Sequence, residues 1–276
     1  MSVLPRTVSS KIPNQFEEAK MSTVTSADGT TIGYTRTGSG PPVVLVDAAS
    51  CFRGNGPMDA LAEALAQDFT VFTYDRRGRG ESTDTPPYTI GREVDDLRAV
   101  IDAAGGSAGV HGFSSGAVLA LHAAAAGAPI TRLSLLEPPL ADDPVPEVDL
   151  VAELEQLVRE GRRGAAVLRF NQAIGVPEEF VAGLRQSPAW PALEKLAHTL
   201  VYDLAITGTA PDLTAVRVPA LVVDSERSDP RLREWSDGVA RRLPDATRAT
   251  LPGEWHGVGP DVLAPVLAAH FGQAAA

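Results

Sequence analysis

Short apolar segments alternate with longer amphipathic segments along most of the chain. The short segments are rich in Val, Leu and aromatic residues and predict strands over residues 30–37, 43–46, 70–74, 109–113 and 131–136. The longer segments carry apolar residues at helical spacing and predict helices over residues 57–67, 90–104 and 115–126. The strand at 30–37 follows an Asp-Gly turn, which indicates a hairpin. Alternation of this kind predicts an α/β fold with a parallel sheet and helices on both of its faces.

The alternation stops at residue 138 and resumes at residue 217. Between them the pattern is mostly helical and is interrupted by prolines, with predicted helices over residues 150–160, 164–173, 178–186 and 192–206. Beyond this region the pattern predicts strands at 219–224 and 247–251 and helices at 232–243 and 261–271. We therefore expect one α/β domain made of residues 23–137 and 217–276, with a helical insertion over 138–216. Residues 1–22 are polar and mixed in charge, and we expect a disordered leader there.

A Gly-x-Ser-x-Gly sequence, residues 112–116, lies between a predicted strand and a predicted helix. In that context it is typical of a nucleophile elbow, a sharp turn that raises the serine hydroxyl above the sheet. Glycines are needed two residues before and after the serine because larger side chains would collide with neighbouring backbone. Ser114 is therefore the candidate nucleophile.

A serine hydroxyl is a weak nucleophile near neutral pH and needs a base that is itself held in place. Among the five histidines, His256 lies in the loop between the last predicted strand and the last predicted helix. A loop at the carboxyl end of a strand can bring a base over the sheet to the serine. The other histidines lie in predicted strands or helices and favour structural roles: His111, His122, His198 and His270.

The acid that would orient the histidine has two possible positions. Glu137 ends the predicted strand at 131–136 and precedes two prolines. The second group follows the predicted strand at 219–224 and consists of Asp224, Glu226 and Asp229. Acidic residues at strand ends are commonly solvated turn residues, so the pattern alone leaves both positions open.

The order serine, acid, histidine, with the elbow between strand and helix, resembles the α/β-hydrolase superfamily. The stretch at residues 74–82, Tyr-Asp-Arg-Arg-Gly-Arg-Gly-Glu-Ser, resembles the Asp-x-Arg-Gly-x-Gly-x-Ser turn of that family. The helical insertion falls where such enzymes carry a cap over the active site. The resemblance covers most of residues 23–271 and implies a mostly parallel sheet with helices on both faces and a helical cap.

The resemblance also bears on the acid. Most members carry it after the strand that follows the cap, in a Gly-x-x-Asp pattern, but residues 225–228 here read Ser-Glu-Arg-Ser. A minority branch, which includes zearalenone-type lactonases, carries the acid before the cap. Its elbow resembles residues 114–117 here, and its glutamate matches Glu137. The resemblance therefore implies a triad of Ser114, His256 and Glu137, with Asp229 as the alternative acid.

The chain departs from the family after the strand at 43–46. Most relatives have His-Gly there, and the backbone N–H that follows helps to hold the oxyanion; this chain has Asp47-Ala48-Ala49. A backbone donor does not depend on a particular side chain. We therefore expect the oxyanion hole to be formed by the N–H of Ser115 and that of Ala48 or Ala49.

The amino-acid composition disfavours several classes of binding partner. With 24 basic and 35 acidic residues the formal net charge is −11, which disfavours nucleic acid and anionic lipid surfaces. Apolar runs are too short to span a bilayer, and the first twenty residues lack the apolar core of a secretory signal, so we expect a cytoplasmic protein. The single cysteine, Cys51, excludes an internal disulfide, and there is no paired-cysteine metal motif.

Together these features predict a serine hydrolase that cleaves a small-molecule ester or lactone through an acyl-serine, without metal or organic cofactor. Amide, thioester and carbon–carbon bond hydrolysis stay open because the same triad supports all of them. A ligand-binding protein on the same fold, with little turnover, is the alternative from another class.

Overall fold

The computed structural model describes residues 21–142 and 148–273. The expected leader lies outside the described residues except for its last two, which begin the first strand. The strands in the described part of the chain form one eight-stranded sheet in the order β1-β2-β4-β3-β5-β6-β7-β8. Their bounds are β1 Met21–Thr25, β2 Thr31–Thr37, β3 Pro42–Val46, β4 Thr70–Tyr74, β5 Ala108–Phe113, β6 Ile130–Leu136, β7 Ala220–Ser225 and β8 Ala246–Leu251.

The strand directions confirm a mostly parallel sheet. Strands β1 and β2 form an antiparallel hairpin, and β2 is also antiparallel to β4. All further neighbours, from β4 through β3 to β8, are parallel. Parallel strands place their carboxyl ends at one edge of the sheet, which is where ligands bind in folds of this kind.

Helices cover both faces because successive side chains of a strand point to opposite sides. In β3, Val44 and Val46 belong to one core cluster and Val43 and Leu45 to the other. The first cluster includes residues of α2 (Ile90–Ala103), α3 (Ser115–Ala125) and α9 (Pro230–Arg242). The second includes residues of α1 (Met58–Leu65) and α10 (Pro260–Phe271). Nearly every residue of these central strands is buried, which explains their continuous apolar pattern.

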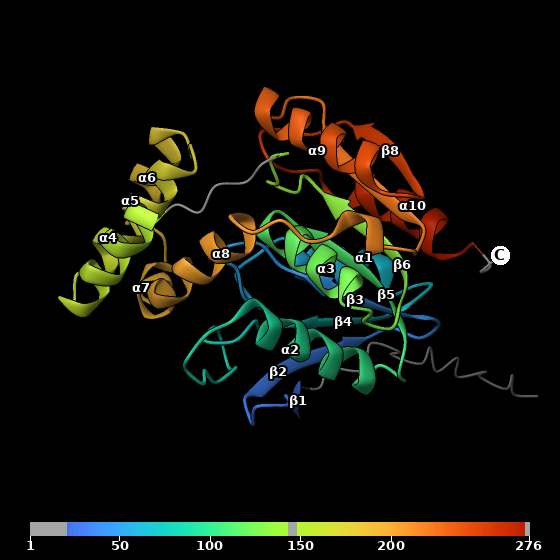
Figure 1. The fold of residues 1–276 in the computed structure, drawn as a ribbon, viewed down its shortest axis with the longest axis horizontal. Coiled ribbons are helices and arrows are strands. Elements are labelled where there is room, and N and C mark those ends of the chain that lie inside the picture. Colours follow the sequence, from blue (N-terminus) through green and yellow to red (C-terminus); the bar gives the residue numbers. More distant parts are fainter. Residues whose placement is uncertain (1–20, 143–147, 274–276) are drawn as a thin grey trace, which may run out of the picture.

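The segment between β6 and β7 is helical, as the pattern predicts. Its helices are α4 Val148–Arg159, α5 Arg163–Ala173, α6 Glu178–Leu184, α7 Trp190–Leu196 and α8 Leu200–Thr207. Figure 1 shows α4 to α7 grouped at one end of the molecule, with α8 running from that group toward α3. The helix predicted at 192–206 is divided in two by a 3₁₀ turn at Ala197–Thr199.

This segment has a core of its own, in which α4, α5, α7 and α8 pack together around Leu154, Phe170 and Leu200. Leu193 and Leu196 belong to that core, so their helical spacing reflects the docking of helices on one another. No helix in the described residues is both long and apolar enough to cross a membrane.

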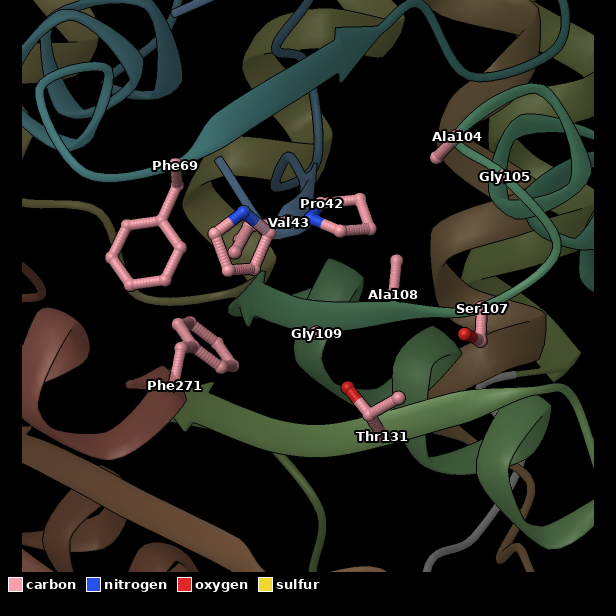
Figure 2. Close-up of a pocket in the computed structure, with 11 residues that line it drawn as sticks. Pro42, Val43, Phe69, Ala104, Gly105, Ser107, Ala108, Gly109, Thr131 and Phe271 are labelled. Atoms are coloured by element: carbon pink, nitrogen blue, oxygen red, sulfur yellow. The ribbon is translucent and has the colours of Figure 1, made fainter. Parts of the chain in front are cut away.

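A cavity of about 340 Å³ lies at the opposite edge of the sheet from the elbow. Figure 2 shows it bordered by Pro42, Ala108 and Thr131, close to the amino ends of β3, β5 and β6, with the rings of Phe69 and Phe271 at one side. Ser114 follows the other end of β5, about 20 Å away at the rise of an extended strand. This cavity is therefore separate from the site formed around Ser114.

Candidate active site

The elbow between β5 and α3 is built on close backbone contacts. Ser114 has φ of 53°, a left-handed conformation that costs a non-glycine residue energy. A Cβ at Gly112 would lie 2.6 Å from the Ala117 Cα, and one at Gly116 would overlap the carbonyl oxygen of Val46. Only glycine allows the strand, the turn and the helix to approach this closely, and the strained turn holds the Ser114 hydroxyl at the carboxyl edge of the sheet.

His256 joins the elbow to a carboxylate. Its Nε2 lies 2.9 Å from Ser114 Oγ, and its Nδ1 lies 2.7 Å from Glu137 Oε2. Ser114 and Glu137 directly follow β5 and β6, and His256 lies in the loop after β8. All three have positive φ, with 46° at Glu137 and 50° at His256. Because a carboxylate can only accept, the ring proton lies on Nδ1, and a neutral ring then accepts from the serine at Nε2. The arrangement can therefore take a proton from Ser114.

Glu137 is fully buried and is held at its other oxygen by β7. Its Oε1 accepts from the backbone N–H of Ser225 at 2.8 Å and from the Ser225 hydroxyl at 2.9 Å. Burial alone would raise the pKa of the Glu137 carboxyl, but the hydrogen bonds from His256 and Ser225 outweigh it and lower that pKa. Glu137 is thus a carboxylate at neutral pH, as stabilisation of an imidazolium requires.

Ser225 is a site residue that the motif analysis did not identify. The register of the sheet places Ser225 beside Glu137, since Leu136 pairs with Val223 in the parallel β6–β7 ladder. That pairing brings Glu137, just beyond β6, beside the last residues of β7. The hydroxyl of Ser225 also lies 2.7 Å from the carbonyl oxygen of Glu254, in the loop that carries His256.

The alternative acid lies elsewhere. Asp229 caps the amino end of α9, where its carboxylate accepts from the backbone N–H of Arg231 at 2.8 Å. Asp224 is paired with Arg248, and Glu226 is exposed. Of the acidic residues weighed, the structure brings Glu137 to the His256 ring.

The loop after β3 offers backbone donors near the elbow. The N–H of Ala48 donates to Asp47 Oδ1 at 2.9 Å, so it is already engaged. Within residues 21–142 and 148–273, the N–H groups of Ala49 and Ser115 have no protein acceptor. Ser115 is also the first residue of α3, where the helix dipole favours negative charge. Burial raises the pKa of the Asp47 carboxyl to about 7, against the opposing effects of the Ala48 N–H and the Arg79 charge.

Comparison with known proteins places the chain in a family. Residues 38–268 match the model of the Alpha/beta hydrolase family. This chain belongs to that family. It is 49% identical to an α/β hydrolase from Sphaerobacter thermophilus of known crystal structure. The match covers 91% of this chain and 100% of that chain, with a TM-score of 0.84.

Two more distant structures share the fold of this α/β hydrolase. A hydrolase from Pseudomonas aeruginosa is 22% identical over 86% of this chain and 91% of that chain, with a TM-score of 0.68. A thermophilic esterase from Thermogutta terrifontis is 23% identical over 86% of this chain and 92% of that chain, with a TM-score of 0.65. No curated protein matched the chain.

Aromatic rings surround the imidazole of this α/β hydrolase. The centroids of Phe113 and Trp255 lie 4.9 Å and 5.5 Å from that of His256. Trp255 in turn stacks on Phe180 of α6 at 6.4 Å, and Phe180 is 60% exposed. No motif marks these residues, and the Trp255–Phe180 contact joins segments far apart in the sequence. The rings give the His256 imidazole apolar neighbours. In the described part of the chain, no three His, Cys, Asp or Glu side chains lie together as a metal site would need.

Proposed function

We propose that this α/β hydrolase cleaves a carboxylic ester or lactone through an acyl-serine intermediate. The observation that carries the proposal is the unbroken chain of hydrogen bonds from Ser114 through His256 to Glu137, at 2.9 Å and 2.7 Å. The acid comes from β6, before the helical segment, as in the lactonase branch that the elbow resembles. That likeness is the reason for including lactones in the substrate class.

The chemistry follows from the positions of the atoms. Ser114 Oγ attacks the carbonyl carbon while His256 Nε2 takes its proton, and Glu137 stabilises the imidazolium and keeps the proton on Nδ1 in place. The oxyanion of the tetrahedral intermediate accepts from the N–H groups of Ser115 and Ala49, each worth about 3 kcal/mol in other serine hydrolases.

Collapse of the intermediate breaks the carbon–oxygen bond, and the imidazolium gives its proton to the departing alkoxide. A water molecule then attacks the acyl-serine, with His256 as the base again, and releases the acid and the free Ser114 hydroxyl. In a lactone the alcohol and the acid are parts of one molecule, so ring opening gives a single hydroxy acid.

We assign residues 138–216 the role of a cap, because α8 contacts α3 and α6 brings Phe180 to Trp255 beside the histidine. An apolar wall of Phe113, Trp255 and Phe180 would favour substrates with an apolar or aromatic group next to the scissile bond.

A second function, ligand binding with little turnover, is favoured by one observation. The loop after β3 lacks the usual His-Gly, and the N–H of Ala48 is engaged by its neighbour Asp47. In this second function the Ala49 N–H would not reach the oxyanion, and a hole with Ser115 as its one donor would bind a carbonyl compound yet stabilise the oxyanion poorly.

Turnover distinguishes the two functions. The test is a panel of p-nitrophenyl esters of increasing acyl length together with small to macrocyclic lactones, measured for the wild type and for Ser114→Ala. We expect wild-type turnover to fall by at least about 10³-fold in the variant, with an unchanged circular dichroism spectrum and melting temperature. Calorimetric binding without wild-type turnover would support the ligand-binding function, and equal turnover in the variant would refute the serine mechanism.

A further inference from the structure

A cluster of four charged side chains is buried beneath the elbow. Arg76 and Arg79 come from the turn after β4, Glu93 from α2, and Asp203 from α8. All four side chains are at most 2% exposed. Arg76 Nε donates to Glu93 Oε1 at 2.5 Å, and Arg76 Nη1 and Arg79 Nη2 donate to the two oxygens of Asp203 at 2.8 Å and 2.6 Å. The two positive and two negative charges balance.

One branch of this cluster holds Ser115. The Ser115 hydroxyl donates to Asp203 Oδ1 at 2.8 Å, and the same hydroxyl oxygen lies 3.2 Å from Arg76 Nη1. Ser115 is 2% exposed and follows the proposed nucleophile directly. Its side chain is therefore held by a residue 88 positions away. Its backbone N–H has no acceptor among the residues that the structure describes and can donate at the elbow.

The other branch holds the loop after β3. Arg79 Nη1 donates to the carbonyl oxygen of Ala48 at 2.8 Å. That carbonyl belongs to the same peptide unit as the N–H of Ala49. Because a trans peptide is planar, its C=O and N–H point in opposite directions. The bond from Arg79 therefore sets the direction of the Ala49 N–H, and Arg79 is itself held by Asp203.

The charge state of Asp203 suits this arrangement. Burial would raise the pKa of its carboxyl, but the charges of Arg79 and Arg76 outweigh burial and lower that pKa. A buried ion cluster commonly stabilises a fold no better than apolar side chains of the same volume would. Its directional bonds nevertheless fix the position of each group that it contacts.

We propose that Asp203 is a positioning residue that orients both backbone donors of the oxyanion hole, one through Ser115 and one through Arg79. This inference rests on the proposed function. Asp203 does not touch the substrate in this account, and its location on α8 makes the helical segment a structural part of the oxyanion hole.

The chain offers a matched control for a test. Asp96 of α2 is also fully buried and is held by the neighbouring Arg77, whose Nε and Nη2 donate to it at 2.6 Å and 2.7 Å. Among the described residues, neither Asp96 nor Arg77 bonds Ser115 or the loop at 47–51. Asp203→Asn and Asp96→Asn each remove the carboxylate of a buried aspartate that accepts from arginine. Of the two, only Asp203 is bonded to Ser115 and, through Arg79, to the loop after β3.

The assay measures kcat per titrated active site and KM for one p-nitrophenyl ester, together with Ki for a trifluoromethyl ketone, which forms a tetrahedral oxyanion adduct with the serine. We expect Asp203→Asn to lower kcat by about tenfold or more, to change KM by less than about threefold, and to weaken the ketone as much as it lowers kcat/KM. Asp96→Asn should leave all three values within about twofold of the wild type. A loss of fold stability alone would reduce the number of active sites and would not lower kcat per titrated site while KM stays nearly unchanged.

Equal kcat and Ki in the two variants would overturn the inference, as would a fall in kcat with an unchanged Ki. If Asp203→Asn does not fold, Ser115→Ala decides, because it removes only the hydroxyl and keeps the N–H. We expect it to lower kcat and weaken the ketone in parallel, and unchanged values would refute the positioning role. In either case Ser114→Ala tests the proposed function separately, so the proposed function and the positioning role of Asp203 can fail independently of each other.

Discussion

Replacement of Glu137 by glutamine tests the assignment of the triad acid. The carboxylate accepts three hydrogen bonds, one from the His256 ring at 2.7 Å and two from Ser225 at 2.8 Å and 2.9 Å. A glutamine has the same shape but only one acceptor oxygen, and its other terminal group is a donor. It therefore cannot satisfy both partners in this buried position.

Each orientation of the amide has a cost. If its oxygen faces Ser225, its NH₂ faces His256 Nδ1 and forces the ring proton onto Nε2, where the ring can no longer accept from Ser114. If its oxygen faces His256, its NH₂ meets the N–H of Ser225, which loses its buried acceptor at a cost of about 1–3 kcal/mol. The equivalent change in serine proteases lowers kcat by about 10⁴, or about 5 kcal/mol in activation free energy, and we expect a loss of that order here.

The assay compares kcat per folded protein for Glu137→Gln with that for Asp229→Asn. Asp229 caps α9, and asparagine is an equally good cap, so the second variant should keep kcat within about twofold. A larger loss in Asp229→Asn than in Glu137→Gln would refute the assignment, and nearly full activity in both would show that neither is the triad acid.

Three further predictions concern the surroundings of the triad. Ser225→Ala removes one of the bonds to Glu137 Oε1 and should lower kcat about 2- to 10-fold with little change in KM, measured on the same ester. The free energy of unfolding of Asp47→Asn relative to that of the wild type should rise by about 3 kcal/mol between pH 5 and pH 8, as measured by urea unfolding. Burial raises the pKa of Asp47 to about 7, so the folded protein keeps a proton that the unfolded chain loses near pH 4. The stability of the wild type therefore falls as pH rises between these two values. A parallel pH dependence of stability in the wild type and the variant would contradict this. Gly112→Ala places a methyl group against Ala117 and should lower the melting temperature by several degrees, for a cost of about 1–3 kcal/mol, and an unchanged value would contradict the close packing of the elbow.

Local patterns were sufficient to predict seven of the eight described strands and the positions of the candidate site residues along the chain. Strands such as Thr70–Tyr74 end where their apolar runs end, since the central strands are buried on both faces. The Gly-x-Ser-x-Gly spacing predicted the elbow because the close contacts of Gly112 and Gly116 require it. The position of Glu137 at the end of β6 made it a candidate, and the family resemblance chose it over Asp229.

Contacts between distant segments could not be predicted from local sequence patterns. Asp203 lies on an apolar helix whose pattern predicts docking on neighbours, and nothing near it indicates a bond to a serine 88 positions away. The break between α7 and α8 at Ala197–Thr199 contains no glycine or proline, so the helical spacing continued through it. Ser225 looked like a substitute for a family glycine, and its role became visible only in the register between β6 and β7.

Covalent labelling of the serine measures the central claim most directly. The protein would be incubated with an organophosphonate ester at neutral pH, and the site of any adduct would be located by intact-mass and peptide analysis. The account predicts one phosphonyl group on Ser114, no adduct in Ser114→Ala, and much slower labelling in His256→Ala. An unlabelled wild-type protein, or an adduct on another residue, would contradict it.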